Sequence, residues 1–528
     1  MCTIPFVGWI ANAAARFSGN HGTVTASAQQ TGCSRQCVYD HAQKVLTAVE
    51  AQHGGSPTRE ELIQQNDILR RDNAQLWDWL SQTIEFPPAK QQQFAVTATA
   101  MGLSLNQILA LLAVLLGAPA CPGRSTIHRW VKAAAIAAGT VLRRLDRAAK
   151  TLVLVGCLDE IFFHRRPVLV GVEPHSMVWF LGKKADNCQG ATWFGELKSW
   201  TSLRRVVCDA GSGLQAGIAA VQKDRRAHPE ESVPLEAGLD VFHTKREAGR
   251  VLKTLWNRVE RSWEQAEAAT RAAEWAQRQG RDGRGPARAA RLAWKKVEVV
   301  FRRHERDEAA WARAAPALCV FRPEGLLNDR AWAEAEIAAA LPGLSGPEWS
   351  KVRGYLENRE SLTFLDWLHR ELSQLGVAVE LRDALVQLWW SRRQRPRGSN
   401  PQARGGYSAV APLVQQLLCQ RLDPDWREPY RKVAALLSRT VRASSAVECM
   451  NSVLRMHQSR HRTLTQRMLD LKRLYWNTRV FRGGKRKGRC PYEHLGLVLP
   501  GYDFWGLLQD ELNLAEAQAP AEAPGVAA

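Results

Sequence analysis

The sequence lacks the features that would mark a secreted or membrane-anchored protein. Its longest apolar run, residues 108–119, is too short to span a bilayer and is expected to form a buried helix. No charged leader precedes an apolar core and a small-residue cleavage site at the start of the chain. Lipidation signals and amphipathic basic helices are missing as well. We therefore expect a protein of the cytoplasm without membrane attachment.

Acidic residues are scarce, and closely paired cysteines are absent. The 528 residues include 52 Asp and Glu against 72 Lys and Arg, which gives a formal net charge of +20. This excess predicts salt-sensitive attraction to a polyanion, and nucleic acid is the expected partner. The 11 cysteines form no CxxC pair, and Cys33 and Cys37 have no matching His or Cys pair downstream. Reduced, mostly buried thiols are therefore expected.

A chain of this length is expected to form three or more folded units, and its first 55 residues outline two short helices. Residues 24–30 form one candidate helix, Gly32 lies in a break, and Ser34 would cap a helix that runs through residues 38–45. This pattern predicts a helix-turn-helix over residues 1–55, with a plain helical hairpin as the alternative. The candidate DNA-contacting side chains are Arg35 and Tyr39.

Residues 56–88 carry a seven-residue repeat. Leucines recur at one heptad position, and mainly asparagines follow four residues later, as at the d and a positions of a short coiled coil. The pattern predicts a helix that pairs with a second subunit, with packing against its own domain as the alternative. The repeat consists of Leu62, Leu69 and Leu76, with Asn66, Asn73 and Leu80.

A second candidate helix-turn-helix occupies residues 89–148. Ser104 would cap a helix over 105–116, residues 119–123 would break the chain, and Ser125 would cap a helix over 126–137. Two such units in a basic protein favour DNA recognition over a role in small-molecule metabolism. Candidate DNA-contacting residues at the entry of the second helix are Arg124, Thr126, His128 and Arg129.

Residues 149–243 change to a strand-rich pattern. Short apolar runs separated by turn residues predict five strands, with one helix before the fourth strand and another before the fifth. The order of the elements is therefore β-β-β-α-β-α-β. The predicted strands are 152–158, 168–173, 177–181, 204–208 and 235–242, and the helices are 191–202 and 213–223.

The rest of the chain is predicted to be largely helical. Residues 244–440 form an all-helical insertion, 441–482 contain one long helix over 444–481, and 483–528 form a basic segment with a disordered tail from Ala515. Tryptophans in the insertion are expected to pack between helices rather than stack on flipped bases. They are Trp256, Trp263, Trp294, Trp332, Trp367, Trp389 and Trp390.

Three acidic residues stand out because of their places in this pattern. Asp159 is expected to close the first strand and Asp209 the fourth, and Glu448 lies near the start of the last predicted helix. Divalent ions such as magnesium prefer oxygen ligands, and two of them about 4 Å apart can activate a nucleophile and stabilise a leaving oxygen. Three unrelated surface carboxylates are the alternative.

Four motifs carry a resemblance to a known family. They are Leu-Asp-Glu-Ile-Phe-Phe at 158–163, Val-Val-Cys-Asp-Ala-Gly-Ser-Gly-Leu at 206–214, Asp-Val-Phe-His at 240–243 and Ser-Ala-Val-Glu-Cys-Met-Asn-Ser at 445–452. In this order they look like the motifs of insertion-sequence transposases, so the chain resembles the DDE transposases and integrases. The resemblance covers residues 150–243 and 441–482. It implies a ribonuclease-H-like core that is interrupted by the helical insertion.

By that resemblance, Asp159, Asp209 and Glu448 would be the catalytic residues and the ligands of two Mg²⁺ or Mn²⁺ ions. Asp240 and His243, expected at the end of the fifth strand, would be supporting residues, although a His there is more often structural.

Some family members carry Tyr and Arg before the final Glu and a Lys seven residues after it. Here Val441 and Ser444 occupy the upstream places and Arg455 the downstream one, which argues against that subgroup. Asn451 and Arg455 share a helix face with Glu448, so Arg455 could reach a phosphate, with an ordinary surface arginine as the alternative.

Two further expectations concern charge near the acids. Glu160 follows Asp159 in a strand, so its side chain should point the other way and not act as a co-ligand. Arg460 and Arg462 are candidate DNA contacts, and the basic runs 392–397 and 485–489 could bind DNA backbone, although solvated loops remain an alternative for each.

The sequence therefore predicts a multidomain α+β protein that acts as a DNA transposase. Its partners would be double-stranded transposon ends and target DNA, in a homodimer or larger synaptic complex associated with the nucleoid. A regulator that has lost catalysis and a structure-selective nuclease of the same fold are the alternatives.

Overall fold

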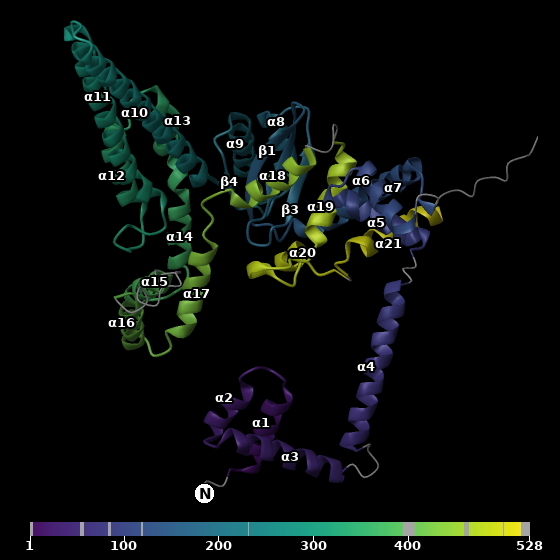
Figure 1. The fold of residues 1–528 in the computed structure, drawn as a ribbon. Helices are drawn as coiled ribbons and strands as arrows, with labels where there is room; N and C mark the ends of the chain where they lie inside the picture. The colour runs from purple at the N-terminus through teal and green to yellow at the C-terminus, as the bar shows by residue number, and fades with distance from the viewer. Residues whose placement is uncertain are drawn as a thin grey trace, which may run out of the picture. The chain divides into compact units, whose positions relative to one another are not determined.

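The computed structural model describes residues 4–52, 58–82, 86–117, 120–230, 232–393, 407–458, 464–499 and 501–518. The chain divides into two compact units, Met1–Pro87 and Pro88–Ala528. Most of the described residues are helical, and the second unit contains one five-stranded sheet (Figure 1). The predicted combination of extensive helical regions with a small sheet is confirmed. None of the described helices is long and apolar enough to cross a membrane.

The first unit begins with three helices that enclose a small polar core. The buried Asn12 amide lies 2.9 Å from His41 Nδ1 and accepts a hydrogen bond from Ser27 Oγ at 2.7 Å. Gly32 adopts a left-handed conformation with φ of 66°, and Ser34 Oγ accepts a hydrogen bond from the Cys37 amide, as the sequence predicts. The three helices are α1 (Phe6–Phe17), α2 (Thr23–Thr31) and α3 (Arg35–Gln52).

The helix α4 (Arg59–Gln82) completes the first unit and exposes an apolar stripe. Thr58 and Glu61 cap its start with reciprocal backbone bonds of 3.3 and 2.7 Å. The predicted heptad leucines are solvent-exposed, with relative accessibilities of 52% for Leu62, 62% for Leu69 and 54% for Leu76. This helix therefore leaves its apolar residues open to a partner.

The second unit starts with α5 (Pro88–Met101), α6 (Leu105–Leu116) and α7 (Arg124–Ala149). Ser104 and Gln107 form the capping box of α6, so the predicted cap is confirmed.

Two predictions for these helices are wrong. In α6 only Ile108 and Leu112 are buried among the described residues, and Val114 is 84% exposed, so the apolar run is an amphipathic rather than a buried helix. The start of α7 is capped by Gly123 and not by Ser125. The helix extends to Ala149 because its apolar face packs against α5 and α19 (Gln466–Thr478).

The sheet has the strand order β3-β2-β1-β4-β5. Antiparallel pairing joins β1 to β2 and β2 to β3, whereas β4 is parallel to both β1 and β5. Two helices follow the strands in the predicted places, α8 (Gly190–Leu197) and α9 (Ser212–Ala227). The strands are β1 (Val155–Phe163), β2 (Arg166–Val172), β3 (Trp179–Lys184), β4 (Arg205–Cys208) and β5 (Glu236–Leu239).

The strand ends differ from the prediction at two acidic residues. Asp159 does not close β1; it lies inside the strand opposite Val170 of β2, because the antiparallel ladder continues to Phe163. The parallel ladder between β1 and β4, however, ends with the pair Leu158 and Cys208, so Asp159 is the first residue past it. Asp240 and His243 do not end β5, which stops at Leu239.

Residues after β5 form the predicted helical insertion. Its two longest helices, α10 (Val241–Arg278) and α11 (Arg284–Ala314), pack along each other as an extended hairpin (Figure 1). The helices that follow are α12 (Arg330–Ala340), α13 (Ser350–Glu357), α14 (Thr363–Ser373), α15 (Val379–Arg393), α16 (Tyr407–Leu422) and α17 (Arg427–Arg439).

The prediction that the insertion tryptophans form core holds only in part. Trp367 is buried, but Trp256, Trp263 and Trp294 on the hairpin are 42%, 46% and 37% exposed. Trp263 stacks edge-on against Trp294 and donates a hydrogen bond to Glu267. A two-helix hairpin has too little interior to enclose such large side chains.

The C-terminal part is broken into shorter helices than predicted. Instead of one helix over 444–481, the structure has α18 (Ser445–Gln458) and α19, and Thr465 caps α19 by accepting a hydrogen bond from the Met468 amide. Two helices follow, α20 (Pro491–Leu495) and α21 (Phe504–Gln518). The predicted disordered tail from Ala515 is wrong as far as Gln518, which is still helical.

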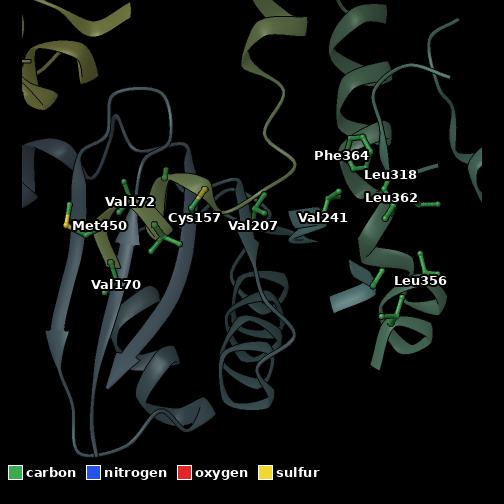
Figure 2. Close-up of a cluster of buried hydrophobic side chains, with 14 of the residues drawn as sticks. Cys157, Val170, Val172, Val207, Val241, Leu318, Leu356, Leu362, Phe364 and Met450 are labelled. Atoms are coloured by element: carbon green, nitrogen blue, oxygen red, sulfur yellow. The ribbon is translucent and has the colours of Figure 1, made fainter. Parts of the chain in front are cut away.

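One continuous hydrophobic cluster joins the sheet, α18 and the insertion (Figure 2). Strand residues such as Cys157 and Val172 lie beside Met450 of α18, and Val241 continues the cluster toward insertion residues such as Phe364. This shared core holds α18 against β1 and β2, although nearly the whole insertion separates them in the sequence.

Candidate functional site

Three sequence-predicted acids meet where the parallel pairing between the inner strands β1 and β4 ends. Asp159 and Asp209 each follow the last paired residues of the parallel strands β1 and β4, and Glu448 lies in the first turn of α18. Both Asp209 and Glu448 raise the pKa of Asp159 by their negative charge, which requires them to lie close to it. The structure therefore brings the three carboxylates together.

The carboxyl of Asp159 is partly buried and held by two hydrogen bonds. Burial, reinforced by the charge of Asp209, raises the pKa of its carboxyl to about 6. Its Oδ1 accepts a hydrogen bond from the Glu160 amide at 2.8 Å, and its Oδ2 accepts one from Asn451 Nδ2 at 2.6 Å. These two donors fix the orientation of the carboxylate.

Asp209 is held by the tight turn that leads from β4 into α9. Its Oδ1 accepts a hydrogen bond from the Gly211 amide at 3.0 Å, and its carbonyl accepts one from Gln215 Nε2 at 3.1 Å. A Cβ atom on Gly211 would lie only 3.0 Å from Asp209 Oδ1, so the glycine leaves space around this carboxylate.

Glu448 lies between two basic side chains. Its Oε1 is 3.4 Å from His243 Nε2, and its Oε2 is 3.8 Å from a guanidinium nitrogen of Arg455. This short distance agrees with the prediction that Arg455 and Glu448 share a helix face. The side chain of Arg455 is 58% exposed, so it also reaches solvent.

His243, which lies next to Glu448, is in the first turn of α10, and Asp240 is the N-cap residue of that helix; neither residue belongs to β5. Asp240 caps the helix by accepting a hydrogen bond from the Phe242 amide at 2.7 Å. Its Oδ2 lies 2.7 Å from His243 Nδ1 and also accepts a hydrogen bond from the Ser444 hydroxyl. Burial would raise the pKa of Asp240, but the bonds from His243 and Ser444 outweigh it and lower that pKa. The bond to Asp240 raises the pKa of His243, and its other ring nitrogen faces Glu448.

Glu160, predicted to point away from Asp159 and not to be a co-ligand, nevertheless lies close enough to the acids for their charges to act on it. Burial and the charges of Asp209 and Asp159 raise the pKa of Glu160 to about 7. A Cβ on Gly211 would lie 3.6 Å from Glu160 Oε1, which places this carboxylate beside the Asp209 turn. Its Oε2 is buried without a hydrogen-bond partner in the structure. Strand alternation missed this residue because β4 ends at Cys208, so the Asp209 turn comes within reach of both faces of β1.

The sequence predicts that Asn451 shares a helix face with Glu448, and the structure shows that it also binds Asp159. It is 1% exposed, and while its Nδ2 donates to Asp159, its buried Oδ1 has no hydrogen-bond partner among the residues that the structure describes. An amide in this place orients the acid without adding a charge.

The donor set fits a hard divalent cation in chemistry. Carboxylate oxygens are the ligands that magnesium and manganese prefer, and at this site burial, together with neighbouring carboxylates, disfavours the charged forms of Asp159 and Glu160. Within the described ranges, no group of three or more His, Cys, Asp or Glu side chains is arranged to hold a metal ion as it stands. The acids instead bind internal donors, such as Asn451, the Gly211 amide and His243.

The predicted DNA-contacting residues lie on other elements. Arg35 and Tyr39 are exposed on α3, and the guanidinium of Arg16 lies 5.3 Å from the centre of the Tyr39 ring. At the start of α7, Arg124, His128 and Arg129 are exposed and Thr126 is half-buried. Arg460 and Arg462 lie outside the described residues.

Comparison with known proteins adds no family to this picture. No protein-family model matches the sequence, and no curated protein matches it either. Whatever is said of its function therefore rests on the residues and their arrangement.

Proposed function

We propose that this protein is a DNA transposase whose acidic site cleaves and joins phosphodiester bonds with two divalent metal ions. The observation that carries the proposal is that Asp209, at the end of β4, and Glu448, on α18, both lie close enough to Asp159 of β1 for their charges to act on its carboxyl. The strand order β3-β2-β1-β4-β5 is the order expected for a ribonuclease-H-like core, which supports the resemblance of the sequence motifs to DDE transposases. A charge of +20 suits a DNA partner.

The side chains divide into ligands and positioning residues. Asp159, Asp209 and Glu448 would hold Mg²⁺ or Mn²⁺, and the bound ions would supply activation of water or a 3′ hydroxyl and stabilisation of the leaving oxygen. Asn451 orients Asp159 through its 2.6 Å bond, and the Asp240–His243 pair positions Glu448.

Arg455 completes the site on the DNA side. Its exposed guanidinium, 3.8 Å from Glu448, is placed to bind a phosphate next to the one that reacts. Hydrolysis would free a 3′ hydroxyl at the transposon end, and this hydroxyl would then attack target DNA in line.

The proposal is tested by magnesium-dependent cleavage and strand transfer on DNA that carries the ends of the element encoding the protein. We expect Asp159→Asn, Asp209→Asn and Glu448→Gln each to lower both rates by about a thousandfold or more, because each removes a ligand charge. DNA binding measured in EDTA should persist. Asp224→Asn, an exposed acid on α9, is the matched control and should retain wild-type rates.

The outcomes separate the alternatives. Cleavage without joining of ends to target, and without preference for those ends, would assign the site to a structure-selective nuclease. Binding without any metal-dependent cleavage by the wild type would assign the chain to a regulator that has lost catalysis, and the transposase proposal would be abandoned.

The N-terminal helices are proposed to serve DNA-end recognition and assembly. Helices α2 and α3 have the lengths and the short glycine-containing turn of a helix-turn-helix, and α3 exposes Arg35 and Tyr39 one turn apart. Helices α6 and α7 are proposed as the second such unit, with Arg124 and Arg129 exposed near the start of α7.

For α4 we propose pairing with a second copy of the chain. Three leucines at seven-residue spacing, each more than half exposed, form a stripe that a copy of the same helix complements. Asn66 and Asn73, at the facing positions, would fix the register of the pair.

Sedimentation velocity tests this pairing. Leu69→Asp should shift a concentration-dependent dimer to monomer, whereas Arg71→Asp, on the opposite side of the helix, should leave the dimer intact. A wild-type chain that stays monomeric at all concentrations would contradict the pairing.

A further inference from the structure

A groove of about 570 Å³ lies beside the first turns of α18, the helix that carries Glu448. Its walls come from three separate stretches of the sequence, one of which includes both the link before α18 and the start of α18. They are the turn between β2 and β3, the link from α17 to α18 together with the start of α18 itself, and the 3₁₀ turn Gly484–Arg486. No local sequence pattern predicts that the last segment lies next to α18.

The lining of this groove is basic, and no Asp or Glu contributes to it. Four permanent cations line it, together with His175. In the described part of the chain, none of the four forms a salt bridge with a carboxylate, whereas many exposed arginines elsewhere do, for example Arg313 with Glu336. The four cations are Arg439, Arg442, Lys485 and Arg486.

The nearest carboxylate, Glu173, is committed to its own turn. It is 5% exposed, and it accepts hydrogen bonds from the His175 amide at 3.1 Å and from the Ser176 amide at 2.6 Å. It therefore reduces the positive charge of the groove without occupying it. Burial lowers the pKa of His175; the charge of Glu173 opposes this shift, and the neighbouring cations add to it.

Two of the cations are fixed in place by backbone carbonyls. Arg486 donates two hydrogen bonds of 2.7 Å, to the carbonyls of His175 and Pro174, and Arg442 donates one of 3.0 Å to the carbonyl of Leu318. Arg439 and Lys485 are exposed at the groove. A rigid base with two adaptable cations is suited to a polyanion that presents several charges along its length.

We infer that this groove binds the phosphodiester backbone of DNA as it passes the start of α18. The inference rests on the proposed function for the choice of DNA, but it assigns a surface that the metal-binding acids do not need. The positive end of the α18 dipole, at Ser445, adds to the attraction for phosphate. The concave shape fits a strand backbone better than a flat lipid surface.

The test compares two variants that lose the same charge. Arg439→Gln with Lys485→Gln removes the adaptable groove cations, and Arg431→Gln with Lys432→Gln removes two exposed cations on α17 that lie near Glu428. Binding to a short random-sequence duplex in EDTA is measured by fluorescence anisotropy over a salt series. We expect the groove variant to lower the slope of log K against log salt by about 2, at about 0.9 per phosphate contact. The control should keep the wild-type slope.

A second readout uses Cys449, which is exposed and lines the groove. Bound DNA should slow its alkylation, measured by mass spectrometry of the corresponding peptide, and anionic lipid vesicles should not. Protection by vesicles alone, or a groove variant that binds like the control, would overturn the inference.

The groove inference and the proposed catalytic function can fail independently in these experiments. If the groove variant binds DNA normally while Asp159→Asn abolishes cleavage, the groove assignment fails and the transposase proposal stands. If the slope changes as expected but the wild type never cleaves, the groove is confirmed and the catalytic proposal fails.

Discussion

Asp159 and Glu160 at the sheet and Glu348 in the helical insertion have carboxyl pKa values that are shifted in opposite directions by their surroundings. In the insertion, Glu348 lies between Arg258 and Arg303, and its pKa is lowered to about 2, chiefly by the hydrogen bond from Arg258. At the sheet, burial raises the pKa values of Asp159 and Glu160 to about 6 and about 7, and the charges of neighbouring carboxylates add to this effect.

A lowered carboxyl pKa and a raised carboxyl pKa have opposite consequences for the free energy of unfolding. A carboxylate with a lowered pKa gains free energy from folding in its charged form, so it stabilises the protein at neutral pH. Acids with raised pKa values cost free energy in the charged form, and such costs collect at sites where another ligand supplies the missing charge. The divalent cations of the proposed function would supply that charge at the sheet site.

The larger effect is expected at the sheet. Asp159→Asn removes the repelled charge, and an amide flip of Asn451 would let its unpartnered Oδ1 accept a hydrogen bond from the new side chain. We expect the variant to be more stable than wild type by about 1 to 2 kcal/mol above neutral pH, after allowance for solvent. Thermal unfolding in EDTA measures the difference.

The gain in stability of Asp159→Asn over wild type should depend on pH. Because the folded-state pKa of Asp159 is raised from 3.8 to about 6, its contribution to stability is present below the lower value and is lost as the pH rises through the higher one. The advantage of Asp159→Asn should therefore be absent near the lower value and should grow until the pH exceeds the higher one. A variant less stable than wild type throughout this window would show that the charge of Asp159 is already compensated.

A smaller effect of opposite sign is expected in the insertion. Glu348→Gln should lower stability at neutral pH by less than about 1 kcal/mol, because the pair is partly solvated. The folded-state pKa of Glu348 is lowered from 4.5 to about 2, so the wild-type advantage should be full above the higher value and should vanish as the pH falls through the lower one. The same unfolding series measures it. A loss that does not change with pH would indicate lost packing instead of lost charge.

Local features of the fold were predictable where a short stretch of sequence decides them. Ser104 with Gln107, Ser34 and Gly32 mark helix ends through their own side chains or backbone freedom, and the structure places them as expected. The break between α18 and α19 was missed because the apolar pattern is helical on both sides, and the capping bond of Thr465 was not recognised.

The candidate site was predictable only in part. Asp159, Asp209 and Glu448 were identified by their order and motifs, and the structure brings them together. The place of Glu160 depends on where β4 ends relative to β1, and the contact of Asn451 with Asp159 depends on how α18 lies on the sheet. The exposure of Trp263 and Trp294 was decided by the thin hairpin on which they lie.

By itself the sequence determined the basic charge, the helix caps at Ser34 and Ser104, the number of strands and the choice of the three acids, because these follow from residue type and short-range spacing. Only the tertiary structure decided that Glu448 meets Asp159 across the long insertion, that Glu160 joins them, and that Lys485 shares a groove with Arg439. These juxtapositions depend on packing between segments distant in the chain, through the core that Cys157, Val172 and Met450 share (Figure 2). No local pattern specifies which buried faces will meet.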